Sequence, residues 1–116
     1  MKAHPLYSTE NESAFLRVFG STPQLRIIDF FLDNPHFDFT REEIMGALGM
    51  AKRTLARHLP ALRDSGLIEV SRRIGRAELY RLNPDSALAA RLRELEEEIT
   101  ANPAYAEVPQ IPAGKS

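Results

Sequence analysis

The side chains best suited to chemistry in this chain are cationic, and they gather in one stretch. Residues 51–82 hold eight Lys or Arg against three Asp or Glu, whereas the 116-residue chain has a net charge of −1. A local surplus of positive charge attracts a polyanion even where the net charge conceals it. The alternative to a binding role is an ordinary solvated face that happens to be basic. The distribution favours nucleic acid as the partner.

Within this stretch, Arg53 and Arg57 stand one helical turn apart, on the side of an expected helix opposite to its leucines. Arginine can donate two hydrogen bonds to guanine O6 and N7 in the major groove, and Thr54 can contact a thymine methyl group or an acceptor. We predict that Arg53, Thr54 and Arg57 read bases of duplex DNA.

Three further residues are better placed for the DNA backbone. Lys52 opens the same helix, His58 lies on its flank, and Thr40 opens the preceding helix. The first turns of such helices approach phosphates, which fix register without reading sequence. We predict phosphate contacts for Lys52, His58 and Thr40.

A second basic cluster surrounds Gly75, where two short apolar runs are expected to reverse direction. Arg72, Arg73 and Arg76 flank this glycine, and long arginine side chains can follow phosphates or enter a narrow minor groove. We predict that Arg72, Arg73, Gly75 and Arg76 form a DNA-contacting wing. Arg81, farther from the tip, is a candidate for a structural role.

Capping residues and hydrophobic periodicity predict the helices and strands that must position these residues. Ser21-Thr22-Pro23 starts a helix that Asn34-Pro35 stops, and Thr40 with Glu43 has the spacing of a capping box before a helix ending at Gly49. The segment 15–19 could be a strand or a helical turn. Phe37-Asp38-Phe39 suits a minimal edge strand.

The next helix is expected from about Lys52 to Ser65, and Pro60 predicts that it is bent or split there. Residues 67–72 and 77–82 read as the strands of a hairpin. The predicted fold class is mainly α with a small β-hairpin wing: a winged helix-turn-helix plus a C-terminal amphipathic helix.

Residues 19–82 resemble the winged helix-turn-helix transcription regulators of archaea and bacteria, of the MarR- and ArsR-like kind. The resemblance rests on the run from Leu55 to Leu67, the Arg-x-Gly-Arg hairpin and the proline inside the second helix. It implies three helices plus a wing, a dimer, and binding to operator DNA. One departure is Ala51, where a Ser or Thr cap is usual, which forfeits about 1 kcal/mol.

The last expected helix carries an apolar stripe with 4-3-4 spacing, typical of a coiled-coil seam. Barely two heptads are too short for an isolated coiled coil, so the helix packs on its own domain or joins a two-fold interface. We favour a homodimer with dimerisation residues Leu88, Leu92, Leu95 and Ile99.

The predicted organisation has four parts. They are a flexible N-terminal arm at 1–12, the winged helix-turn-helix domain at 13–83, a C-terminal dimerisation helix at 84–100 and a flexible tail at 101–116.

Other functional classes find little support. The chain has no cysteine, its three histidines lack metal-ligand spacing, and neither a phosphate loop nor a nucleophile elbow is present. We therefore predict no catalytic residue, no metal, no cofactor and no enzyme activity. Without an apolar run of about 18 residues or a signal peptide, we predict no membrane partner and a cytoplasmic, nucleoid-associated protein.

The sequence thus predicts a sequence-specific transcription regulator that binds double-stranded DNA, with the second helix in the major groove and the wing on the flanking backbone or minor groove. The alternative is a winged-helix protein-protein interaction module without significant DNA affinity, which docks through its acidic terminal helix. Whether a small-molecule effector binds is left open.

Overall fold

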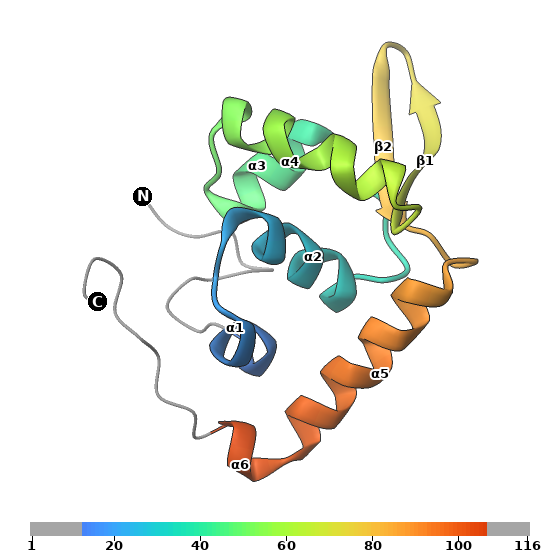
Figure 1. Ribbon diagram of the computed structural model, residues 1–116. Helices are drawn as coiled ribbons and strands as arrows, with labels where there is room; N and C mark the ends of the chain where they lie inside the picture. The colour runs from blue at the N-terminus through green and yellow to red at the C-terminus, as the bar shows by residue number, and fades with distance from the viewer. Residues whose placement is uncertain (1–12, 107–116) are drawn as a thin grey trace.

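The computed structural model describes residues 13–106, which form helices and one two-stranded antiparallel hairpin (Figure 1). In chain order the elements are α1 (Ala14–Phe19), α2 (Pro23–Asp33), α3 (Arg41–Leu48), α4 (Lys52–Asp64), β1 (Ile68–Ile74), β2 (Ala77–Leu82), α5 (Ala87–Ala101) and α6 (Pro103–Ala106). The predicted mainly helical class with a small hairpin is confirmed. The expected arm at 1–12 and residues 107–116 of the expected tail lie outside the described residues.

α1 settles the segment that the sequence left open between strand and helix. The hydroxyl of Ser13 caps it by accepting a hydrogen bond from the amide of Leu16, and Phe15 and Leu16 are buried. The same hydroxyl donates to Oδ1 of Asp29 at 2.8 Å. One side chain therefore both starts α1 and ties it to α2.

α2 is the central helix of the fold, with α3 and α4 on one side and α1 and α5 on the other (Figure 1). It starts as predicted, with Thr22 capping the amide of Leu25 and Pro23 in the first turn. Its most buried apolar side chains are those of Ile27, Phe30 and Phe31.

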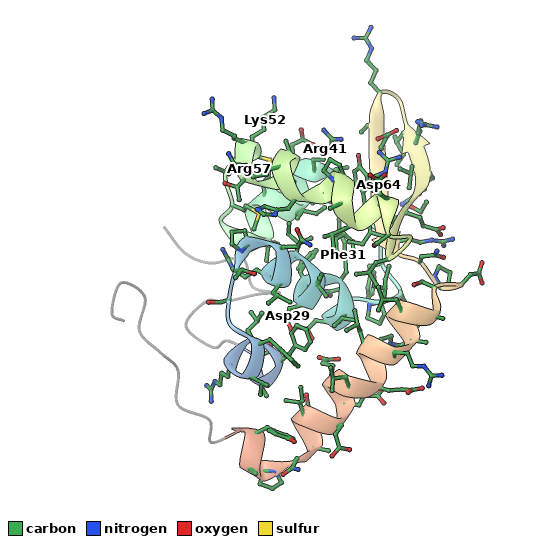
Figure 2. The ribbon with its side chains drawn as sticks, viewed as in Figure 1. Asp29, Phe31, Arg41, Lys52, Arg57 and Asp64 are labelled. Carbon is green, nitrogen blue, oxygen red and sulfur yellow. The ribbon has the colours of Figure 1, made fainter. Side chains whose placement is uncertain are left out.

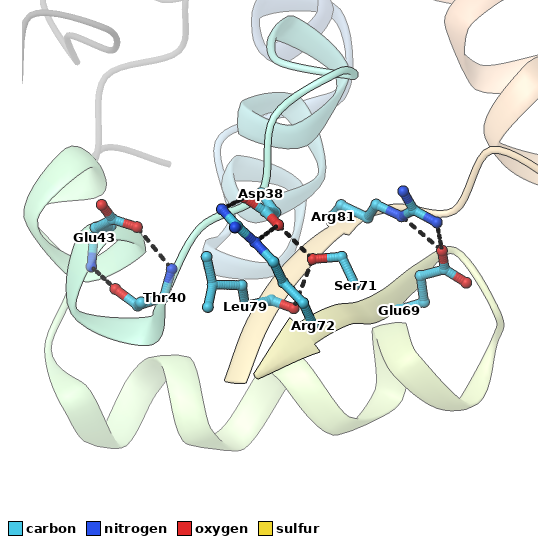
Figure 3. A network of polar contacts seen from close by, with 8 residues as sticks. All are labelled: Asp38, Thr40, Glu43, Glu69, Ser71, Arg72, Leu79 and Arg81. Carbon is cyan, nitrogen blue, oxygen red and sulfur yellow. Dashed lines mark hydrogen bonds and ion pairs between the residues drawn. The ribbon is translucent and has the colours of Figure 1, made fainter. Parts of the chain in front are cut away.

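α3 begins with the predicted capping box. The hydroxyl of Thr40 accepts from the Glu43 amide, and the Glu43 carboxylate accepts from the Thr40 amide (Figure 3). Gly49 ends the helix at φ 60°, a left-handed conformation that glycine adopts without the usual Cβ clash. The sharp turn into α4 follows from this residue.

α4 runs without interruption through Pro60, so of the predicted bend or split the split is wrong, and the bend stays a prediction. Proline removes one amide hydrogen bond, which leaves the carbonyl of Ala56 without its helical donor. Both Ala56 and Pro60 are exposed, so water can bind that carbonyl. Ala51 precedes the helix without a side-chain cap, as its residue type predicts.

The hairpin pairs β1 with β2 from Ile68 opposite Leu82 to Ile74 opposite Ala77. β1 extends two residues beyond its expected end, so that the turn is Gly75-Arg76. The register shifts once, between Val70 and Arg72. The expected edge strand at residues 37–39 is a single bridge, in which Phe39 and Tyr80 exchange both backbone hydrogen bonds.

α5 follows the hairpin and starts at Ser86, whose hydroxyl accepts from the amide of Ala89. Ala89 and Ile99 of this helix enter the same core as α2. The sequence placed the start of a flexible tail at residue 101, but α5 extends to Ala101 and α6 follows. In the described part of the chain, no helix combines the length and apolar character needed to cross a membrane.

Candidate functional site

One face of α4 is cationic and open to solvent. Lys52, Arg53 and Arg57 are exposed at its N-terminal end, and Thr54 is half-buried between them. The other face is held in the core by Leu55, Leu59 and Leu62. The packing thus fixes the helix and leaves the predicted base-reading residues accessible.

Two of the three residues predicted to contact the DNA backbone already have partners within the protein. Nδ1 of His58 lies 3.1 Å from Oε1 of Gln24 on α2, and the hydroxyl of Thr40 serves the capping box of α3. The ammonium group of Lys52 has no hydrogen bond or ion pair with any other described residue. Of the three side chains, that of Lys52 is therefore the one most available to an external anion.

Arg72 is tied down by a carboxylate that the sequence did not connect to it. Nε and Nη2 of Arg72 donate to the two carboxylate oxygens of Asp38 at 2.9 and 3.2 Å (Figure 3). The hydroxyl of Ser71 also donates to Asp38. The hydrogen bond from Arg72 is the largest cause that lowers the pKa of Asp38, and the same bond raises the pKa of Arg72.

Arg73 is likewise paired, with Glu78 directly opposite on β2. The second oxygen of Glu78 accepts a 2.8 Å hydrogen bond from the Tyr80 hydroxyl. This bond, followed by that from Arg73, lowers the pKa of Glu78. Burial raises the pKa of Tyr80, and the hydrogen bond to Glu78 adds to this effect. The hydroxyl therefore stays protonated and acts as the donor.

The hairpin tip carries the one wing arginine that is free of such pairing among the described residues. Arg76 is exposed and follows Gly75, which has φ 61°. Arg81 pairs with Glu69 at 2.7 Å, and its structural role stays a prediction. Of the four hairpin arginines, Arg76 is the one best able to meet an external anion.

The α4 cations and the hairpin share one edge of the molecule. Figure 2 shows Lys52, Arg57 and Arg41 on the side from which the hairpin projects, opposite α5 and α6. Cations from α3, α4 and the hairpin therefore border one surface. This arrangement can contact a line of negative charges.

The leucine stripe of α5 divides into two sets. Ile99 is buried, and Leu92 is half-buried against the core. Leu88 and Leu95 are 49% and 38% exposed. The helix therefore packs on its own domain, and two of the four predicted dimerisation residues remain available to a partner.

A cluster that sequence reasoning missed joins α2 to α5. Carboxylate oxygens of Asp29, Asp33 and Glu96 lie within 4.8 Å of one another. Burial, then the hydrogen bond and repulsion from Asp33, raise the pKa of Glu96 to about 8. Protonated Glu96 can therefore donate a hydrogen bond to Asp33 at neutral pH. The separation of 63 positions between Asp33 and Glu96 left no sequence signal for this pair.

The structure also adds Arg41, at the start of α3, to the candidate surface. Its Nε donates to the hydroxyl of Tyr80 at 3.1 Å. Neither the charge of residues 51–82 nor their periodicity could identify it, because Arg41 lies outside that stretch.

Comparison with known proteins gives no relative for this arrangement: no protein family, curated protein or solved structure matches the chain.

Proposed function

We propose that this chain is a sequence-specific, double-stranded DNA-binding transcription regulator of the winged helix-turn-helix class, related to the MarR- and ArsR-like regulators. In this proposal α3 and α4 form the helix-turn-helix, and the hairpin is the wing. The observation that carries it is the exposure of Arg53 and Arg57 on α4, with Arg57 on the side from which the hairpin projects (Figure 2).

The proposed DNA contacts are assigned by the position of each side chain and by whether it already has a partner within the protein. Arg53, Thr54 and Arg57 project from the first turns of α4, where side chains can meet base edges. Lys52 and Arg76 have no competing partner among the described residues and are assigned to phosphates or the minor groove. Arg72 is assigned mainly a structural role, because its ion pair with Asp38 ties the hairpin to the segment before α3.

We further propose a homodimer in which α5 supplies the interface through Leu88 and Leu95. Exposed large apolar residues on an otherwise charged helix are suited to a two-fold contact, with other elements contributing area. Two copies of α4 would then read half-sites about one DNA turn apart, or a multiple of it.

Selection of bound sequences from a random pool of duplex DNA tests this function. The proposal predicts enrichment of a motif with two related halves, spaced by about 10 base pairs or a multiple. A pool that remains random after several rounds would reject sequence-specific recognition.

A second candidate function is a winged-helix protein-protein interaction module. The exposed Leu88 and Leu95, on a helix rich in glutamate, favour this alternative. Pull-down with and without nuclease separates the two functions, because an adaptor keeps its partners once DNA has been destroyed.

A further inference from the structure

An open pocket lies between the start of α3 and the hairpin, beside the α4 surface. Its volume is about 470 Å³. It is lined by Arg41 and Glu42 from α3, and by Arg73, Arg76, Ala77, Glu78 and Tyr80 from the hairpin. Segments more than 30 positions apart in sequence thus build one recess.

The charge of this pocket favours an anion. Three arginines and two glutamates line it. Glu78 is already engaged by the Tyr80 hydroxyl and by Arg73, and Arg63 lies 3.9 Å away. Glu42 is the one lining carboxylate that opposes an incoming anion, and it sits exposed at the start of α3.

Arg41 is held in place by a buried tyrosine. Besides the Nε hydrogen bond to the Tyr80 hydroxyl, its guanidinium carbon lies 5.7 Å from the centre of the Tyr80 ring. Tyr80 itself is 0% exposed. Among the described residues, the terminal nitrogens Nη1 and Nη2 of Arg41 have no hydrogen-bond acceptor. A fixed guanidinium with two unused nitrogens is well prepared to bind two oxygens of one anion.

We propose that this pocket seats a phosphate group, bound by Arg41 and Arg76, with Tyr80 and Glu78 as positioning residues. The inference rests on the proposed function to the extent that the phosphate belongs to the DNA backbone, beside the major groove that α4 is proposed to enter. A phosphate group of duplex DNA and a free phosphate ion share the chemistry that the pocket recognises.

The first arm of the test uses the wild-type protein and inorganic phosphate. Nitrogen-15 spectra of the arginine Nε–H groups should shift for Arg41 and Arg76 during the titration. Arg17, which is exposed on α1, a helix on the side of the molecule away from the hairpin (Figure 1), should not shift. This arm needs no substitution and so does not depend on whether a variant folds.

The second arm measures duplex DNA affinity across salt concentrations for Arg41→Gln, Arg41→Lys and the control Arg17→Gln. Loss of one phosphate contact should lower the slope of log affinity against log salt by about 0.9 for Arg41→Gln. Arg41→Lys keeps the charge and should keep the slope, with weaker binding. Arg17→Gln should match the wild type.

The outcomes separate this inference from the proposed function. Phosphate-induced shifts in a protein that binds no DNA would support the pocket as a site for free phosphate and reject the DNA function. A reduced slope for Arg41→Gln without shifts from inorganic phosphate would support a seat specific for the DNA backbone. DNA binding with no shift and an unchanged slope would overturn the pocket proposal alone. If DNA binding and the shifts are both absent, both proposals fail.

Discussion

Nη2 of Arg73 lies 2.8 Å from Oε2 of Glu78, and the two residues face each other across the hairpin. The carboxylate of Glu78 therefore neutralises an arginine at the surface that we assign to DNA. A phosphate that recruits Arg73 must compete with this internal partner. Cations counted along a sequence therefore overstate the charge available to a ligand.

Glu78→Gln should strengthen DNA binding. The amide keeps the shape of the side chain and can still accept from Tyr80, but it removes the charge that holds Arg73. We expect affinity to rise a few-fold and the salt dependence to steepen, by up to about 0.9 in slope. Fluorescence anisotropy with labelled duplex DNA measures both quantities.

Glu69→Gln is the matched control for this substitution, since Glu69 also pairs with an arginine, Arg81, to which the proposal assigns no DNA contact. Unchanged or weaker binding by Glu78→Gln would show that Glu78 does not compete with DNA for Arg73.

Arg57→Ala and Arg76→Ala should have different effects on DNA binding. Arg57→Ala removes a proposed base contact and should reduce discrimination between the selected site and scrambled duplexes by about 1–3 kcal/mol. Arg76→Ala removes a proposed backbone contact and should weaken both duplexes alike. The ratio of dissociation constants for the two duplexes reports the difference. Equal loss of discrimination in both variants would refute this division of roles.

Stability should fall as pH rises from about 4.5 to about 8. The ordinary pKa of a glutamate carboxyl is 4.5, and burial beside Asp33 raises the pKa of Glu96 to about 8 in the folded chain. Between these values the folded chain holds a proton that the unfolded chain has released, so the free energy of unfolding decreases with pH. Above about pH 8, deprotonated Glu96 faces the carboxylates of Asp33 and Asp29.

Thermal unfolding between about pH 5.5 and about pH 8.5 measures this effect. The wild-type Tm should fall by several degrees, whereas Glu96→Gln, which keeps a neutral donor toward Asp33, should lose most of the decrease. The same pH dependence in wild type and variant would assign it to other groups.

Substitutions in the buried and in the exposed apolar residues of α5 should affect stability and dimerisation separately. Ile99→Ala creates a cavity in the core and should lower the free energy of unfolding by about 2–5 kcal/mol. The double substitution Leu88→Glu and Leu95→Glu should leave the fold intact and weaken the proposed dimer. Denaturant unfolding and sedimentation velocity report the two effects. A double variant that sediments as the wild type does would remove Leu88 and Leu95 from any interface.

The sequence predicted most of the elements because their signals are local. The Thr40 and Glu43 capping box, the start at Thr22 and the reversal at Gly75 each depend on residues within a few positions. The pairs of Arg72 with Asp38 and of Glu96 with Asp33 depend on elements brought together by the fold, and no local pattern encodes them. The predicted alternative of a split at Pro60 was wrong because the carbonyl of Ala56, which loses its helical donor there, is open to water.

Titration of a duplex carrying the selected motif, across a range of salt concentrations, tests the central claim most directly. For about 6 to 10 neutralised phosphates per dimer, log affinity should fall against log salt with a slope of about 5 to 9. Affinity that stays flat across the salt range, or no binding at low salt, would contradict the assignment of this surface to DNA.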